Sequence, residues 1–152
     1  MLPAQILWLN VVTNGVQDVA LAFARGGEDQ LHRPPRDLSE GLLSRVLWER
    51  TALVAVLMGV GTLGLFRWAE QVEGLEQARA VALTALVLFS AVLVYSSRSE
   101  HRFVWQLRPG GNPFLLAAQV GALLVHLAAL HTPLLQRVLR LEPVSAAAWG
   151  WM

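Results

Sequence analysis

The spacing of the charged residues is the feature that most constrains what this chain can fold into. Four long stretches carry no charge except Asp18 in the first of them: 1–24, 51–66, 80–97 and 109–136. A helix needs about 20 mainly apolar residues to cross a hydrocarbon core roughly 30 Å thick. These stretches therefore predict four membrane-spanning helices.

The second stretch is the shortest, and the residues at its ends explain how it can still span. Arg50 and Arg67 border it, and long Arg side chains near helix ends extend toward the lipid headgroups. A fifth apolar stretch, 144–152, is too short to cross. We expect an all-α, polytopic transmembrane helix bundle with four spans plus a truncated fifth, and a chain that is incomplete at both ends.

The composition excludes several other classes of protein. Apolar residues make up 55% of the sequence and charged residues only 15%, which is too few to cover a soluble domain of this size. Cysteine is absent, which excludes disulfides and thiolate metal sites. The net charge of +1 gives no basic surface for a nucleic acid. We therefore expect membrane lipid as a partner and no nucleic acid.

The arginines are unevenly distributed among the connections between the spans. Five lie in 25–50 and three in 98–108, whereas the turn 67–79 has two at its edges and three Glu inside it. Short Arg-rich loops stay on the cytoplasmic side, so we expect the loops 25–50 and 98–112 to be cytoplasmic. The first of these loops holds an extended elbow, because neither proline in it can donate a backbone hydrogen bond: Arg33, Pro34, Pro35 and Arg36.

The first span carries a stripe of polar side chains. On a regular helix, positions i, i+3, i+4, i+7 and i+8 share one face, and here they are occupied by Asn10, Thr13, Asn14, Gln17 and Asp18. Amide, hydroxyl and carboxylate oxygens are the ligands that hard cations take. An ionisable residue inside a membrane marks a site or a pathway by default. We predict a partial cation site of Asn10, Thr13, Asn14 and Asp18, with Asp18 facing the protein interior.

The Asn14-Gly15 step predicts a local weakening of the first span. Gly costs about 1 kcal/mol relative to Ala in a helix, and Asn side chains compete for backbone hydrogen bonds. Two other interpretations of this segment stay open. The stripe can be the wet face of a surface amphipathic helix, and Asn-Gly can form a β-hairpin turn.

Smaller patterns predict how the spans pack and connect. Small residues four apart favour close helix contact, which suggests Ala55 with Gly59 and Ala117 with Gly121. Residues 133–141 form a short interfacial helix in this interpretation. His126 and His131 are five residues apart, a poor spacing for a metal pair on one helix face.

The run Gln5-Ile6-Leu7-Trp8-Leu9-Asn10-Val11-Val12-Thr13-Asn14-Gly15 and the elbow at 33–36 together resemble a known family. They are similar to the sixth membrane helix and the following cytoplasmic loop of P-type cation-transporting ATPases of the calcium-pump and sodium-pump class. In that family the helix reads Leu-Trp-Val-Asn-Leu-Val-Thr-Asp-Gly and the loop reads Asp-Arg-Pro-Pro-Arg. The later spans resemble helices seven to nine and the start of helix ten by pattern alone.

The resemblance implies three regions in the chain. Residues 1–24 would be the ion-site helix, 25–50 the cytoplasmic coupling loop with the start of the next helix, and 51–152 the supporting membrane helices. In the family, Asn10, Thr13 and Asn14 occupy positions where the sixth helix supplies cation ligands. Asn14 stands where the calcium pumps carry Asp, which lowers the charge of the site and leaves the transported cation open.

The function that the resemblance implies is that of the C-terminal membrane domain of an ATP-driven cation pump. The family's phosphorylation and nucleotide-binding motifs have no counterpart here, so we expect no enzymatic activity and no bound cofactor in this chain alone. ATP and Mg²⁺ would be used by the remaining pump domains, its partners in cis or as a split fragment. The location would be the bacterial plasma membrane. The alternative is a small stand-alone membrane accessory or assembly protein without transport activity.

Overall fold

The computed structural model describes residues 2–23, 45–97 and 112–152. Within these ranges the chain forms helices and connecting turns and no strand. The prediction of an all-α fold is therefore confirmed for the described residues. The elements in chain order are α1 (Pro3–Asn10), η1 (Val11–Gly15), α2 (Val16–Ala22), α3 (Arg45–Val72), α4 (Leu75–Ser96), α5 (Pro113–His131), α6 (Pro133–Leu139) and α7 (Ala146–Trp151).

Four of the helical runs are long enough to cross a membrane. α3, α4 and α5 each have the length and the apolar composition of a membrane span. α1, the π-helical turn η1 and α2 follow one another without a break from Pro3 to Ala22, about 30 Å at 1.5 Å per residue. With the short α7, this arrangement agrees with the expected four spans plus a truncated fifth.

Proline and small capping residues determine where several helices begin. Pro3, Pro113 and Pro133 occupy the first turns of α1, α5 and α6, where a missing N–H costs nothing because the first N–H groups of a helix have no internal partner. Asn112 caps α5 by accepting a hydrogen bond from the Leu115 N–H at 3.1 Å. These local signals favour helix starts at these positions.

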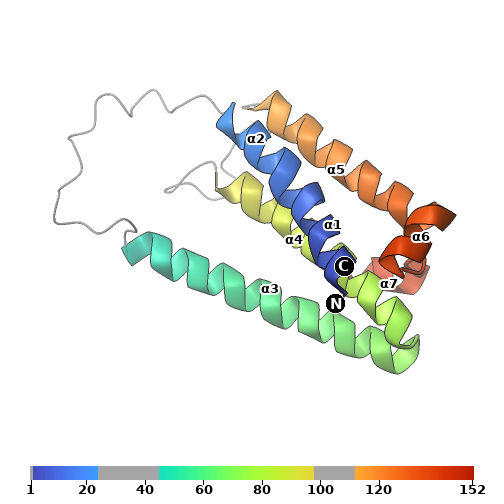
Figure 1. Cartoon of the computed structure of the whole chain (residues 1–152). Coiled ribbons are helices and arrows are strands. Elements are labelled where there is room, and N and C mark those ends of the chain that lie inside the picture. The colour runs from blue at the N-terminus through green and yellow to red at the C-terminus, as the bar shows by residue number, and fades with distance from the viewer. Residues whose placement is uncertain (1, 24–44, 98–111) are drawn as a thin grey trace, which may run out of the picture.

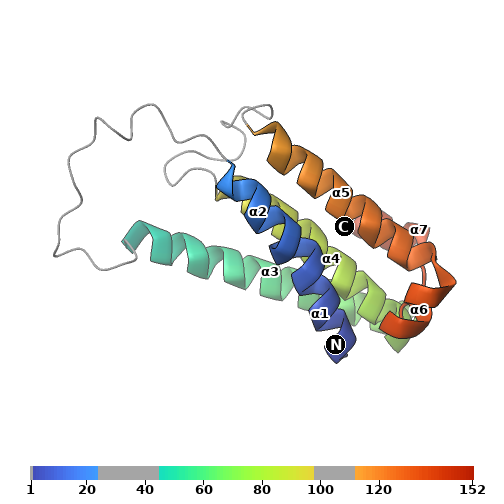
Figure 2. The same cartoon turned by 45° about the horizontal axis from the view of Figure 1, so that its top comes forward.

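The helix made of α1, η1 and α2 packs against both α4 and α5 (Figures 1 and 2). α3 and α4 meet at a tight turn and diverge toward their other ends (Figure 1). Gly74 forms this turn with a φ of 92°, a conformation that is strained for residues with a Cβ. In an apolar 18-residue stretch of α4, 44% of the residues are buried, against 6% in the corresponding stretch of α3. α4 is therefore the central helix of the chain and α3 an outer one.

The tight packing occurs near the end of the molecule that holds the Gly74 turn, α6 and α7. One buried cluster joins α4, α5 and α6 through Ala80, Leu83, Ala129, Leu130, Leu139 and Leu141. A second joins α3, α4 and α7 through Ala69, Ala78, Val81 and Ala148. Small Ala side chains on α4 let the neighbouring helices approach closely.

The predicted small-residue contacts are wrong within this chain. A Cβ placed on Gly59 or on Gly121 would meet no atom within 4 Å. The close approach occurs instead at Gly61, where a Cβ would lie 3.1 Å from Cζ of Phe89. Spacing alone does not reveal which face of a helix meets a neighbour, because that face depends on where the other helices lie.

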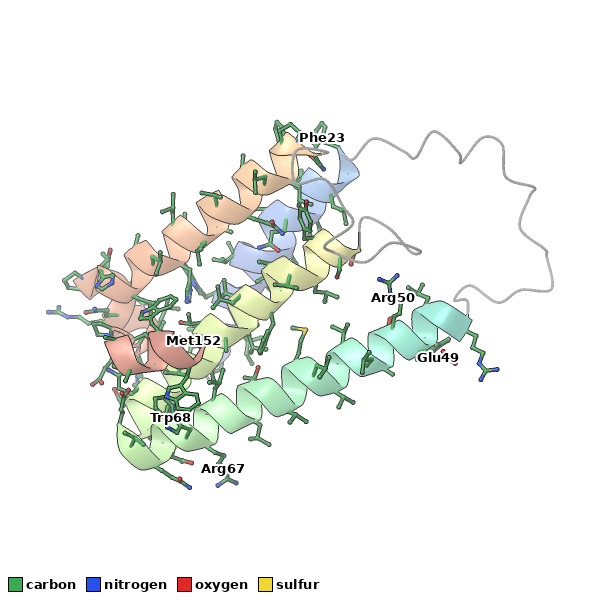
Figure 3. The ribbon with its side chains drawn as sticks, turned by 180° about the vertical axis from the view of Figure 1, so that it is seen from behind. Phe23, Glu49, Arg50, Arg67, Trp68 and Met152 are labelled. Carbon is green, nitrogen blue, oxygen red and sulfur yellow. The ribbon has the colours of Figure 1, made fainter. Side chains whose placement is uncertain are left out.

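The ends of α3 carry the charges expected to border a membrane span. Glu49 and Arg50 lie toward one end and Arg67 and Trp68 toward the other (Figure 3). Trp68 also packs against Trp151 of α7, with ring centroids 6.0 Å apart. α6 spans Pro133–Leu139, which confirms the prediction of a short helix in 133–141. Arg140 follows it with a φ of 47°.

Candidate cation site

The candidate site lies on the π-helical turn η1, which interrupts the first span at Val11–Gly15. This turn confirms the predicted weakening of the helix near Asn14. A π-turn adds a residue to a helical turn, and such turns are frequent at functional sites. A Cβ on Gly15 would lie 3.8 Å from the Asn10 carbonyl oxygen, an ordinary contact, so lack of space does not require glycine there.

Hydrogen bonds within the turn connect three of the four candidate ligands. Asn14 Nδ2 donates to Asn10 Oδ1 at 3.0 Å. The Thr13 hydroxyl donates to the Leu9 carbonyl at 2.7 Å and approaches Asn14 Oδ1 at 3.3 Å. The two amides and the hydroxyl thus form a compact group of oxygen atoms on one turn of the helix.

The structure divides the predicted stripe between two faces. Asn10, Asn14 and Asp18 are exposed, whereas Thr13 and Gln17 are 3% and 1% exposed. The extra residue of the π-turn changes the angular spacing on which the prediction of a single face relied. Within this chain Asp18 faces outward, so an interior position for its carboxylate requires helices beyond those described.

The exposed face of the first span is mixed in character. It also carries large apolar side chains that are 47–66% exposed: Ile6, Leu7, Val11, Val16 and Val19. Such a face is unsuited to water, which argues against a surface amphipathic helix. The hairpin interpretation is wrong, because the backbone around Asn14 is helical.

The buried face of the first span carries polar contacts that the sequence analysis did not predict. Gln5 Nε2 donates to the Leu139 carbonyl at 2.9 Å. Trp8 Nε1 donates to His126 Nδ1 at 3.2 Å, and His126 Nε2 lies 3.0 Å from Thr84 Oγ1. The available signal was a polar residue among mainly apolar neighbours in each of two spans, Thr84 in α4 and His126 in α5.

Asn112 makes a further contact of this kind at the other end of the first span. Its Nδ2 donates to the Ala20 carbonyl at 3.1 Å, while its Oδ1 caps α5. One buried side chain therefore joins the end of α2 to the start of α5.

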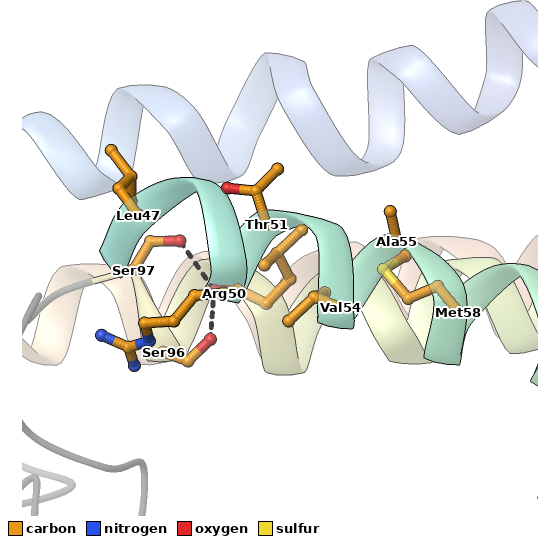
Figure 4. A pocket seen from close by; sticks show the side chains of 9 residues that line it. Leu47, Arg50, Thr51, Val54, Ala55, Met58, Ser96 and Ser97 are labelled. Atoms are coloured by element: carbon orange, nitrogen blue, oxygen red, sulfur yellow. Dashed lines mark hydrogen bonds between the residues drawn. The ribbon is translucent and has the colours of Figure 1, made fainter. Parts of the chain in front are cut away.

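Two of the cavities that flank the central helix α4 are lined in part by the polar residues named below. One of about 210 Å³ is lined by Gln17, Gln119 and apolar residues of α4 and α5. Gln17 Oε1 is buried and has no hydrogen-bond partner among the described residues. The other cavity, about 500 Å³, lies between α3 and α4 and is lined by residues that include Arg50, Ser96 and Ser97 (Figure 4). Both serine hydroxyls donate to the Leu93 carbonyl at the end of α4.

The remaining predicted residues lie outside the described ranges. The elbow Arg33, Pro34, Pro35 and Arg36 is among them, as are the loop residues 98–111. Within the described residues, no three side chains of His, Cys, Asp or Glu come together as a metal site. A complete cation site would therefore need ligands beyond those that this part of the chain brings together.

The sequence matches the family described as "Cation transporting ATPase, C-terminus" over residues 1–152. The chain belongs to this family. Together with the apolar helices, this membership makes it an integral membrane protein. The helices described above are thus those of the C-terminal region of a cation-transporting ATPase.

Curated relatives agree with this assignment. The chain is 31% identical over 150 residues to "Probable cation-transporting ATPase F" of Mycobacterium tuberculosis, an alignment that covers 98% of this chain and 17% of the relative. It is 30% identical to "Calcium-transporting ATPase" of Bacillus subtilis, with 98% and 17% covered. It is 32% identical to "Calcium-transporting ATPase type 2C member 2" of Mus musculus, with 93% and 15% covered. The chain thus spans about a sixth of the length of these relatives.

Proposed function

We propose that this chain is the C-terminal membrane domain of an ATP-driven cation pump and supplies part of its cation site. One observation carries the proposal: Asn10, Asn14 and Asp18 are exposed on a membrane-length helix that is interrupted by a π-turn. Their oxygen atoms are the kind that replace the water shell of a hard cation. The cation site on this exposed face would be complete when further helices of the pump supply the remaining ligands.

The remaining domains of the pump are the partner that the proposal requires. They would bind ATP and Mg²⁺ and carry the phosphoryl chemistry, while the elbow at 33–36 couples that chemistry to the membrane. Two of the relatives are named calcium-transporting. Ca²⁺ affinity follows the number of ligand charges, and among the four candidate ligands only Asp18 carries one, so we leave the cation as a small hard ion.

The proposed location is the bacterial plasma membrane, with lipid around the apolar helix faces. α3 supports lipid contact, because most of its large apolar side chains are exposed. The excess of Arg in 25–50 and 98–108 favours a cytoplasmic position for both loops.

The test compares two acidic residues in the full-length protein. Its ATPase activity is titrated with Ca²⁺, Mn²⁺, Na⁺ and K⁺ in the wild type, in Asp18→Asn and in the loop control Asp37→Asn. We expect Asp18→Asn to abolish stimulation or to raise the half-activating cation concentration about tenfold or more, because the variant loses a ligand charge. Asp37→Asn should leave that concentration nearly unchanged.

Equal half-activating concentrations in the wild type and in Asp18→Asn would show that the polar face only packs helices. A full-length protein without any cation-stimulated ATPase activity would instead favour a membrane accessory or assembly protein.

A further inference from the structure

Three helices of this chain meet at one buried imidazole. His126 and Thr84 are both fully buried. Trp8 of α1 donates to His126 of α5, and His126 contacts Thr84 of α4. We call Trp8, His126 and Thr84 the histidine bridge.

The hydrogen-bonding roles in the histidine bridge follow from its chemistry. The indole nitrogen of Trp8 can only donate, so His126 Nδ1 must accept and carries no proton. The neutral imidazole then carries its proton on Nε2 and donates it to Thr84 Oγ1. Each ring nitrogen thus has a hydrogen-bond partner on a different helix. A side chain that replaces His126 can keep both bonds only if it has an acceptor and a donor.

The histidine bridge lies next to the candidate cation site along the first span. Trp8 precedes Asn10 by two residues and precedes the π-turn at Val11 by three. The other hydrogen bonds that connect this helix to the described residues of the rest of the chain lie toward its ends, at Gln5 and at Ala20. The extra residue of a π-turn can be accommodated at different turns of a helix. Contacts of the side chains before and after it determine the turn at which it is accommodated.

We propose that His126 is a positioning residue for the cation site, acting through Trp8 to fix the rotation of α1 and the place of the π-turn. This inference rests on the proposed function, because it assigns a role in the same cation site. His126 touches none of the candidate ligands in the described structure, so its effect on them is indirect. Groups that hydrogen-bond directly to metal ligands change metal affinity about 10- to 100-fold when they are removed, and we expect the indirect effect of His126 at the lower end of this range.

The variants separate positioning from packing. His126→Leu removes both hydrogen bonds and leaves the Trp8 N–H without a partner. His126→Gln keeps an amide oxygen to accept from Trp8 and an amide N–H to donate to Thr84. His131→Leu is the matched control, because His131 lies on the same helix and is exposed. If His126→Leu does not accumulate, Trp8→Phe takes its place, since it removes the N–H donor and keeps a smaller aromatic ring.

Two measurements are made on the full-length protein. In ATPase titrations with Ca²⁺, Mn²⁺, Na⁺ and K⁺, we expect His126→Leu or Trp8→Phe to raise the half-activating concentration about tenfold. The maximal rate should change less than about twofold, because only the geometry of the cation ligands is altered. His126→Gln should restore the half-activating concentration to within about threefold, and His131→Leu should match the wild type.

Hydrogen–deuterium exchange of residues 9–17 is the second measurement, and it needs no transport activity. We expect faster exchange there in His126→Leu or Trp8→Phe than in the wild type and in His131→Leu. An unchanged half-activating concentration, or a Gln variant as defective as the Leu variant, would overturn the inference. If the wild type shows no cation stimulation, the proposed function fails. In that case, equal hydrogen–deuterium exchange of residues 9–17 in the wild type and the variants would separately overturn the positioning role of the histidine bridge.

Discussion

Asn112 joins the end of α2 to the start of α5, and its replacement provides a graded test of the structure. The side chain is 3% exposed and makes two bonds: Oδ1 accepts from the Leu115 N–H, and Nδ2 donates to the Ala20 carbonyl, both at 3.1 Å. Loss of a helix N-cap costs about 1 kcal/mol. Loss of the buried bond to Ala20 costs about 1 kcal/mol more. Asn112→Ala should therefore destabilise the domain by about 2 kcal/mol.

Asn112→Ser separates the two contributions. Serine can still cap α5, but its side chain is too short to keep the bond to Ala20, so about 1 kcal/mol should be lost. For a domain of this size, 1 kcal/mol shifts the melting temperature by roughly 2–4 °C. Thermal unfolding of the full-length protein in detergent should thus rank wild type above Asn112→Ser and Asn112→Ser above Asn112→Ala. Equal melting temperatures for the two variants, or for all three proteins, would refute the assignment of two separate bonds.

Two further substitutions test other contacts by the same unfolding measurement. Gln5→Leu should reduce the free energy of unfolding by about 1–3 kcal/mol, because it leaves the Leu139 carbonyl without its donor. Gln71→Leu on the exposed side of α3 should be nearly neutral. Equal effects of the two substitutions would contradict the buried contact. Gly74→Ala should cost about 1–3 kcal/mol, because its φ of 92° strains a residue with a Cβ, and Gly150→Ala, which meets open space, should not. A neutral Gly74→Ala would show that the turn relaxes to another conformation.

The membrane spans could be predicted from the sequence because the hydrocarbon core imposes a length. Arg50 and Arg67 border the second predicted stretch, and α3 passes beyond both of them. The interruption of the first span was also predictable, since Asn14 and Gly15 both weaken a helix. That the interruption is a π-turn was not predictable, because its type depends on contacts made by the flanking residues.

The residues of the candidate site were proposed from the sequence, but the face on which each of them lies was not predictable. Three of its four residues lie on the exposed face, but Thr13 is buried, because a regular period of 3.6 residues does not continue through a π-turn. The contacts of His126 could not be predicted from its spacing to His131. Its partners lie on other helices, and a single sequence does not show which helices are neighbours.

The polar contacts of the first span have a consequence for the time course of synthesis. They join residues that are 134, 118 and 92 positions apart: Gln5 with Leu139, Trp8 with His126, and Ala20 with Asn112. Ribosomes add about 5–20 residues per second, so Trp8 waits on the order of ten seconds for its acceptor. α3 and α4, joined by one turn, can pack as soon as the second of them is made. The earliest of these helices to be synthesised therefore completes its polar contacts only after α5 and α6 have been made.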